Sequence, residues 1–425
     1  MITNFNEDFL QFIWEQQLFN KSDLKTTDGE PISIIKPGFL NRNSGPDFEN
    51  CEIKIGNTTL FGAIEIHLEA KDWKLHAHQE NEAYNTVILH VCLKAKVDAQ
   101  RKDGTIIPNL ELKDRLNRSS LNNYKLLFEN KQFIPCENQI TNVKNILVNS
   151  WLERLIVDRL EQRCAVFESF LQATNNWNQT FYIALVRAFG MPINTLGFEE
   201  IAAELPADII LKHSDNLFQL EALFFGVSGL LKDDFDSTYY NALQKEYSFL
   251  SKKYKLKSIS CILKFGKMRP MSLPHVKIAQ LAALFRKNPN LSSKVLRLPR
   301  LPDLQNLFDF DTSEYWLTHY NFAKSSKQRS KKMSKNAVEL LLLNAIIPFA
   351  FYYEKVKLKS GSTHALDYLL NLSSEKNSII DKWKSVGIDS GNALNSQALL
   401  HLYKSYCSKK LCLQCNIGRT LLLRD

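Results

Sequence analysis

The chain has 425 residues, 44% of them hydrophobic and 23% charged, with a formal net charge of +9. That length exceeds the size at which one hydrophobic core stops growing, so we expect two or three domains. The composition is that of a soluble globular protein, and its Lys, Asn and Ile content is typical of bacteria. No continuous apolar run reaches the roughly 18 residues of a membrane span, and the first residues lack a signal-peptide pattern. We therefore expect a cytoplasmic protein without a membrane partner.

The first third of the chain combines one helix with several strands. Apolar residues at helical spacing predict a helix over residues 5–19, which Asn4 or Asn6 can cap. Alternating or continuous apolar segments predict strands over residues 31–40, 49–55, 58–68, 84–97 and 106–112. These elements predict an α+β fold, with an α/β domain over residues 1–140.

Helical periodicity dominates the rest of the chain. Residues 151–164 carry apolar side chains at steps of three and four, and similar patterns recur as far as residue 407. No fixed-period repeat is evident. We therefore expect residues 141–425 to form a mainly α-helical domain that ends in a cluster of cysteines.

Acidic residues on two neighbouring predicted strands form the first candidate site. Glu65 and His67 share one face of their strand, because side chains alternate along a strand. A three-residue turn over residues 56–58 would place Asp47 beside His67 and Glu49 beside Glu65, whereas an even-length turn without a bulge would move Asp47 to the opposite face. In the first register, Asp47 and Glu65 can bind Mg²⁺ or Mn²⁺, and His67 can orient or deprotonate a bound water. The alternative is that Asp47 caps a strand and Glu65 faces solvent.

Pro46-Asp47 and Glu65-Ile66-His67 resemble the motif of the PD-(D/E)xK nuclease superfamily, with histidine where lysine is usual. The resemblance covers about the first 130 residues. It implies a restriction-endonuclease-like domain with a mixed sheet, and a divalent-metal-dependent nuclease that cleaves phosphodiesters of DNA or RNA. In some members the first helix supplies a further acidic ligand, and Glu15 is the position that matches it here.

Most of the chain also resembles a bacterial family without an assigned function, the domain of unknown function 2851. This resemblance implies no activity. It rests on these segments: Gly38–Asn41, Gly45–Phe48, Glu65–His67, Asp72-Trp73, His76–His78, Tyr84-Asn85 with His90, Met268–Pro270, Ala279–Leu281, and the terminal cysteines. Asn41, Glu49 and Asp72 are therefore candidate accessory residues beside the acidic motif.

Four of the nine histidines, His67, His76, His78 and His90, fall within 24 residues. His76-x-His78 would place two imidazoles on one face of a strand, which suits a first-row transition metal. A transition-metal enzyme built on these histidines is therefore an alternative to the nuclease. In a third interpretation, Asp72, His76 and His78 contact a substrate near Glu65, and each histidine can also be an ordinary hydrogen-bonded residue.

Cysteines at the end of the chain form the second candidate site. Cys407, Cys412 and Cys415 have the spacing C-x₄-C-x₂-C, which in a reducing compartment favours a metal over disulfides. A fourth ligand is needed, for which Cys136 is the first choice and His401 the second. Four cysteines can hold Zn²⁺ or a [4Fe–4S] cluster, and the pattern resembles nucleases that tie their domain with one distant and three C-terminal cysteines. The alternatives are a chance grouping of structural cysteines and a non-catalytic scaffold protein with a structural metal.

The helical half contains two basic segments. Lys267, Arg269 and Lys277 surround the start of a predicted helix, where they can face phosphates. In the other interpretation, Arg269 only ties two helices together. Residues 324–335 are expected to be a solvated loop or helix start, with phosphate contact as the alternative. The positive net charge permits a nucleic-acid partner without requiring one, and nothing in the sequence indicates an oligomeric state.

Overall fold

The computed structural model describes residues 6–359 and 363–424, and the chain divides into two compact units. The first unit contains residues 1–151, 385–387 and 402–425, and the second contains residues 152–384 and 388–401. The expected α+β class is confirmed, because a mixed sheet lies in the N-terminal part and the rest is mostly helical. Residues 402–425, which the sequence pattern placed with the helical region, belong to the first unit, where α18 (Asn416–Leu422) packs against α3 (Arg118–Phe128).

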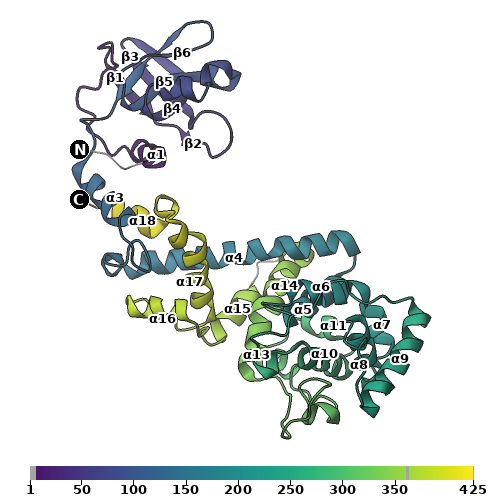
Figure 1. The fold of residues 1–425 in the computed structure, drawn as a ribbon. Coiled ribbons are helices and arrows are strands. Elements are labelled where there is room, and N and C mark those ends of the chain that lie inside the picture. Colours follow the sequence, from purple (N-terminus) through teal and green to yellow (C-terminus); the bar gives the residue numbers. More distant parts are fainter. Residues whose placement is uncertain (1–5, 360–362, 425) are drawn as a thin grey trace. The chain divides into compact units, whose positions relative to one another are not determined.

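A six-stranded mixed sheet forms the centre of the first unit (Figure 1). Its main path runs β1-β3-β4-β5-β8, and β2 pairs with β3. The pairs β1–β3, β2–β3 and β3–β4 are antiparallel, while β4–β5 and β5–β8 are parallel. The strands are β1 (Ile32–Lys36), β2 (Phe39–Leu40), β3 (Phe48–Ile55), β4 (Thr58–Glu69), β5 (Val87–Lys94) and β8 (Asn109–Glu111), and β6 (Ala99–Gln100) and β7 (Ile106–Ile107) pair separately.

Helix α1 (Glu7–Glu15) lies against β4, as Figure 1 shows. The Asn6 side chain caps it by accepting a hydrogen bond from the backbone N–H of Phe9. The helix buries Phe9, Phe12 and Trp14, so its apolar stripe is the contact that attaches it to the unit. Short helical segments follow the strands: α2 (Asp72–Leu75), η1 (His78–Glu80), η2 (Glu82–Thr86), η3 (Ile140–Asn142), η8 (Cys407–Lys409) and η9 (Cys412–Gln414).

Helices and the loops between them, with two isolated β-bridges, make up the described residues of the second unit. Helices α8 and α10 form its centre, since residues 220–227 of α8 and 278–285 of α10 are all buried. The long helix α4 (Asn145–Thr174) enters this unit from the first. The other helices are α5 (Trp177–Phe189), α6 (Thr195–Glu204), α7 (Ala207–Lys212), α8 (Leu217–Val227), α9 (Thr238–Tyr254), η4 (Pro270–Ser272), α10 (Pro274–Lys287), α11 (Leu291–Leu296), α12 (Leu301–Asn306), η5 (Glu314–Leu317), α13 (Lys335–Leu341), η6 (Leu342–Ile346), α14 (Ile347–Tyr353), η7 (Glu354–Leu358), α15 (Thr363–Asn371), α16 (Ser378–Ser385) and α17 (Ala393–Ser405).

One continuous helical stretch, Lys335–Leu358, has the length and mean hydropathy of a membrane span. It comprises α13 and α14 with a π-helical turn after each. In this structure 67% of its apolar window is buried inside the protein. That burial is the environment expected of a core helix, which satisfies its apolar side chains by packing rather than by contact with lipid.

Candidate functional site: a cluster of histidines and a glutamate

The hairpin between β3 and β4 brings Asp47 opposite Glu65. Its turn contains two residues, 56 and 57, because Ile55 pairs with Thr58, so the expected three-residue turn is wrong. A bulge between Phe48 and Cys51 shifts the register by one residue, and Asn50 in this bulge has a left-handed φ of 57°. The bulge therefore restores the alignment that a two-residue turn alone would have prevented.

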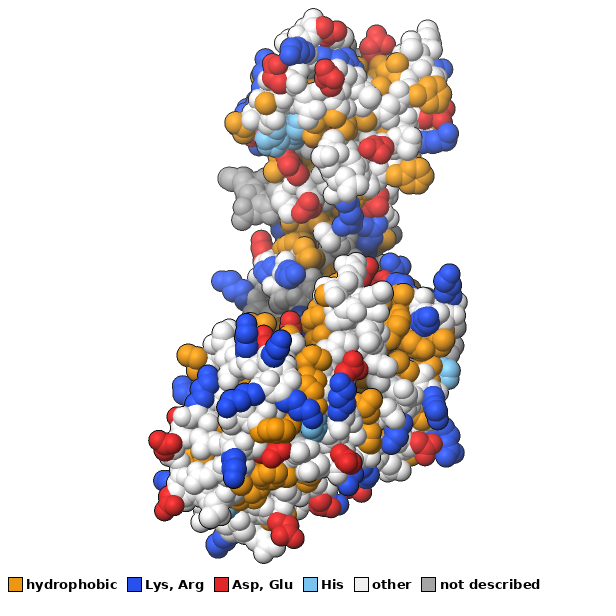
Figure 2. Space-filling model, turned by 90° about the vertical axis from the view of Figure 1, so that its right-hand side faces the viewer, with side chains coloured by type: hydrophobic (Ala, Val, Ile, Leu, Met, Phe, Trp, Pro, Cys, Tyr) orange, Lys and Arg blue, Asp and Glu red, His pale blue; other side chains and the backbone are white. Residues whose placement is uncertain are grey.

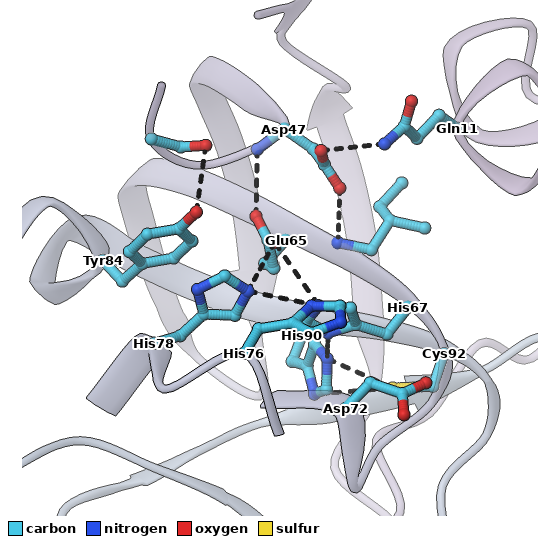
Figure 3. A network of polar contacts seen from close by, with 12 residues as sticks. Gln11, Asp47, Glu65, His67, Asp72, His76, His78, Tyr84, His90 and Cys92 are labelled. Atoms are coloured by element: carbon cyan, nitrogen blue, oxygen red, sulfur yellow. Dashed lines mark hydrogen bonds and ion pairs between the residues drawn. The ribbon is translucent and has the colours of Figure 1, made fainter. Parts of the chain in front are cut away.

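Asp47 forms hydrogen bonds with strand β4 and with helix α1 (Figure 3). Its backbone N–H donates to Glu65 Oε2 at 3.0 Å. Its carboxylate accepts from the backbone N–H of Ile66 at 3.0 Å through Oδ2 and from Gln11 Nε2 at 2.8 Å through Oδ1. Burial and the neighbouring Glu65 charge raise the pKa of Asp47 to about 7. Both oxygens of this carboxylate thus already serve protein donors.

A row of polar side chains crosses three parallel strands beside this hairpin. Glu65 on β4 is in register with His90 on β5, and His90 is in register with Asn109 on β8. His67 lies on the same face of β4 as Glu65, two residues further along. All four side chains are at most 5% exposed. Burying such a polar row costs free energy unless its members are hydrogen-bonded, so we expect each side chain to have a partner.

Hydrogen bonds along this row select one nitrogen of His67. His90 Nδ1 lies 2.8 Å from Asn109 Oδ1, which can only accept, so His90 carries its proton on Nδ1. His90 Nε2 is then an acceptor, and it lies 2.8 Å from His67 Nδ1. His67 must donate from Nδ1, which leaves Nε2 unprotonated. Burial and then the neighbouring histidines lower the pKa of His67 to about 2, and burial lowers that of His90 to about 4, so both rings are neutral.

His76 and His78 complete the cluster from outside the sheet. The expectation that His76-x-His78 lies on a strand is wrong: His76 ends the short helix α2 and His78 begins η1. Ala77 between them has a left-handed φ of 56°, so the chain turns sharply and both rings reach His67. Their ring centroids lie 5.0 Å and 5.2 Å from that of His67.

Three imidazole nitrogens and one carboxylate oxygen of these side chains lie close together (Figure 3). His67 Nε2 lies 3.2 Å from His76 Nδ1 and 3.3 Å from His78 Nε2. Glu65 Oε1 lies 3.2 Å from His78 Nε2 and 3.6 Å from His67 Nε2. The ligand atoms of the three histidines lie within 4.8 Å of one another. Unprotonated His67 Nε2 and Glu65 Oε1 are both acceptors, so a cation between them would satisfy both.

Two aromatic rings pack against the cluster. Tyr84 stacks on His78 with ring centroids 3.9 Å apart, and its hydroxyl donates to Gly45 O at 3.3 Å. Trp73 is buried and lies edge-on to His78 and His90. His76 is exposed, which leaves the cluster open to solvent on that side. Tyr84 and Trp73 therefore pack against the cluster on one side, and the side of His76 is accessible to solvent.

Sequence reasoning missed three residues near the site: Glu7, Gln11 and Asn109. Burial raises the pKa of Glu7 and nearby His76 partly opposes that rise, which places this carboxyl near the cluster. Glu7 and Gln11 are four residues apart, so they share the face of α1 that meets the hairpin. The four-residue spacing could have predicted that Glu7 and Gln11 lie beside the hairpin, but the resemblance pointed to Glu15, four residues after Gln11. No local sequence pattern predicted Asn109, because only the register of β5 and β8 shows that it lies beside His90.

The other predicted residues have different positions. Glu15 forms an ion pair with Arg419 at 2.9 Å. Asn41 holds the loop before Asp47, donating from Nδ2 to Pro46 O at 3.1 Å. Glu49 is exposed.

Two further predicted residues play other parts. Asp72 accepts from the backbone N–H of Glu69 at 3.1 Å through Oδ2. Arg269 belongs to the second unit, so it is not part of the hairpin site.

The four candidate cysteines all belong to the first unit. None is in a disulfide, and Cys136, Cys412 and Cys415 are buried. Burial and, to a smaller extent, neighbouring thiols raise the pKa of Cys136 and of Cys407. The same causes raise the pKa of Cys412 to about 12. The thiols that affect Cys407 are those of the other three cysteines. Two segments distant in sequence thus contribute the four thiols of the first unit, while His401 belongs to the second unit.

Comparisons with known proteins identify a family without identifying an activity. No curated protein and no solved structure matches the chain. The model of one protein family matches residues 7–378, which is most of the chain and includes the whole histidine and glutamate cluster. The chain therefore belongs to the family described as "Protein of unknown function (DUF2851)".

Proposed function

We propose that Glu65, His67, His76 and His78 bind one first-row transition-metal ion, and that this centre hydrolyses phosphodiester bonds in nucleic acid. The observation that carries the proposal is the closeness of three imidazole nitrogens, with a Glu65 oxygen beside two of them. Among the described residues, these three histidines form the only group of three or more His, Cys, Asp or Glu side chains whose ligand atoms all lie within 4.8 Å.

The spacing of the ligand atoms fits such an ion. Metal–nitrogen and metal–oxygen bonds of about 2.0–2.2 Å in a tetrahedral site imply about 3.3–3.6 Å between ligand atoms. The contacts of His67 Nε2 with His76 and His78, and those of Glu65 Oε1 with His67 and His78, lie between 3.2 and 3.6 Å. Three imidazoles and one carboxylate favour Zn²⁺, Fe²⁺ or Mn²⁺ over Mg²⁺, which prefers oxygen ligands alone.

The surrounding residues support each ligand. His90 and Asn109 hold His67 in the tautomer whose free Nε2 faces the cluster. Asp47 donates its backbone N–H to Glu65 Oε2, which leaves Oε1 directed at the histidines. We assign Asp47 this positioning role. The alternative, Mg²⁺ or Mn²⁺ held between Asp47 and Glu65, would need the Asp47 oxygens that already accept from Gln11 and Ile66.

A bound ion of this kind lowers the pKa of a water ligand and so supplies a nucleophile near neutral pH. Exposed His76 marks the side on which water and a substrate can approach. Tyr84 and Trp73 pack against the His78 ring and restrict its movement. The protein's part is to keep four ligands in place around an accessible point.

Two observations favour a phosphodiester as the substrate. Helix α1, the antiparallel strands β1, β3 and β4 and the parallel strand β5 agree with the mixed sheet that the resemblance to the PD-(D/E)xK nuclease superfamily implies. Asp47, directly before β3, and Glu65 and His67 on β4 are the residues that resemble that superfamily's motif. The net charge of +9 adds a general attraction for a polyanion. The histidine that replaces the usual lysine becomes, in this proposal, a metal ligand.

A cleavage assay with matched variants tests this function. Purified protein is stripped with a chelator and reloaded with Zn²⁺, Mn²⁺, Fe²⁺ or Mg²⁺, then incubated with single- and double-stranded DNA and RNA. We expect cleavage with a transition metal, its loss in Glu65→Gln and His78→Ala, and no change in His364→Ala, whose half-exposed ring lies in the helical unit. Cleavage that survives Glu65→Gln and His78→Ala would overturn the proposal.

We also propose that Cys136, Cys407, Cys412 and Cys415 hold a structural Zn²⁺ ion or a [4Fe–4S] cluster. Four buried or half-buried thiols outside any disulfide support it, because the other three thiols raise the pKa of Cys407, and Cys415 and Cys412 raise that of Cys136. Deprotonated thiols are costly in such a place unless a cation binds them. Metal and acid-labile sulfide analysis of protein purified without air decides between one zinc and four irons. Absence of both zinc and iron from the protein, or an unchanged metal content in Cys412→Ser, would contradict the site.

A further inference from the structure

The second unit contains a pocket of about 760 Å³ that includes no residue of the histidine cluster or of the cysteine site. It lies among the ends of α5 and α10, the segment 267–274 and the loop and helix of residues 329–344. Its volume is in the range of small-molecule binding sites. Both basic segments noted in the sequence contribute to its wall.

Charge in this pocket is of one sign. Its lining includes five cations, Lys267, Arg269, Lys277, Arg329 and Lys332, and none of the described residues that line it is Asp or Glu. Lys332 is paired outside the pocket, with Asp309 at 3.2 Å and Asp311 at 3.3 Å. Positive charge that lacks nearby carboxylates attracts an anionic ligand.

Lys277 is the most informative of these cations. It belongs to α10, and its Nζ lies 5.9 Å from the ring centroid of Phe189, another lining residue. In the described part of the chain it has no ion-pair partner, and burial lowers its pKa. Keeping a lysine partly buried without a carboxylate costs free energy, which a bound anion would recover.

The apolar part of the lining is equally unusual. The chain has five methionines, and all except Met1 line this pocket: Met191, Met268, Met271 and Met333. Thioether side chains adapt to the shape of a ligand and contact aromatic rings favourably. Four of them around one pocket indicate a ligand with a flat, apolar part.

One acceptor at the pocket wall lacks a partner. Gln280 is 1% exposed, and its Nε2 donates to Lys331 O at 2.8 Å. Because a carbonyl oxygen can only accept, this bond fixes the amide orientation, and Oε1 is the atom without a partner in the protein. Buried acceptors are normally satisfied, so an N–H group of a ligand at this wall would complete the site.

We propose that this pocket binds a nucleoside phosphate, either free or as the phosphorylated end of a nucleic-acid strand. The phosphate pairs with Lys277 and Arg269, and the base packs among the methionine side chains. An amino-bearing base also supplies N–H donors for Gln280. On the face drawn in Figure 2, Lys and Arg side chains lie among apolar ones on the helical unit. The inference does not depend on the metal centre, because no residue is shared.

Isothermal titration calorimetry with the full-length protein tests the proposal. The probes are AMP, a 5′-phosphorylated single-stranded oligonucleotide and inorganic phosphate. We expect AMP or the oligonucleotide to bind at least about tenfold more tightly than phosphate, because only they fill the apolar part. Binding of AMP identifies a free nucleotide as sufficient, and binding of the oligonucleotide alone identifies a strand end. Binding of neither, or equal binding of phosphate, would overturn the proposal.

Matched variants locate the binding. Lys277→Met and Arg269→Met should each weaken binding by about tenfold or more, because each removes a charged contact. Lys252→Met, which removes the same charge from an exposed lysine of α9, should leave it unchanged. His78→Ala should also leave it unchanged, which separates this site from the metal centre. Circular dichroism confirms that each variant is folded, and unaltered affinity in both Lys277→Met and Arg269→Met would refute the assignment.

Discussion

His90 Nε2 lies 2.8 Å from His67 Nδ1, a contact between two buried rings on adjacent parallel strands. It decides which nitrogen of His67 faces the other ligands. His90 can accept here because its own Nδ1 is held by Asn109 Oδ1 at 2.8 Å. A residue outside the proposed ligand set thus fixes the tautomer of the proposed ligand His67.

Replacing His90 should weaken metal binding without removing a ligand. In His90→Phe the acceptor for His67 Nδ1–H is lost, and we expect metal affinity to fall by about 10- to 100-fold. His90→Gln keeps an acceptor oxygen and should recover part of the loss. Competition titration against a chelating dye measures both affinities. Equal affinity in His90→Phe and the unaltered protein would show that this hydrogen bond does not support the site.

Asp47 should contribute to stability through its hydrogen bonds. In Asp47→Ala, the Ile66 N–H and Gln11 lose their acceptor, and we expect a loss of about 1–3 kcal/mol. Glu49→Ala is the matched control, because Glu49 is an exposed carboxylate two residues further along the chain and should change stability by less than about 0.5 kcal/mol. Urea unfolding of chelator-treated protein measures both, and equal losses would contradict the stabilising role of the Asp47 side chain.

Glu221 should make the second unit less stable as pH rises. It is 1% exposed, accepts from Ser313 Oγ at 2.8 Å and Trp316 Nε1 at 3.0 Å, and burial raises its pKa to about 7. Its stabilising contribution is therefore fully present below its unfolded-state value of 4.5 and is lost as pH rises through about 7. The difference corresponds to a loss on the order of 3 kcal/mol.

Glu221→Gln stays neutral at every pH and should remove this dependence. Urea midpoints followed by tryptophan fluorescence at about pH 5 and about pH 8 test it. The unaltered protein should lose more stability across that interval than Glu221→Gln does. Glu314→Gln, at an exposed carboxyl in the same unit, should behave like the unaltered protein. Parallel behaviour of Glu221→Gln and the unaltered protein would contradict the raised pKa.

The strands of the first unit could be predicted because their apolar patterns are local. Strands expected over residues 49–55 and 58–68 occur as β3 (Phe48–Ile55) and β4 (Thr58–Glu69). Their register could not be predicted, because it depends on a two-residue turn and a bulge at Asn50. Neither feature changes the apolar pattern, yet together they decide that Asp47 faces Glu65.

The histidine cluster was predicted in part. Grouping within 24 residues marked His67, His76, His78 and His90, but the strand expected for His76 and His78 is a helix end and a turn. The pairing of His90 with Asn109 depends on parallel strands far apart in sequence. Tertiary contacts of this kind leave no local pattern, and the position of the terminal cysteines in the first unit is a further example.

Anomalous X-ray scattering from a crystal of metal-loaded protein tests the central claim most directly. Data collected on both sides of the absorption edge of the bound metal locate that ion and identify its element. We predict a peak about 2.0–2.2 Å from Glu65 Oε1, His67 Nε2, His76 Nδ1 and His78 Nε2. A peak between Asp47 and Glu65 instead, or no peak at the four ligands in fully loaded protein, would contradict the account.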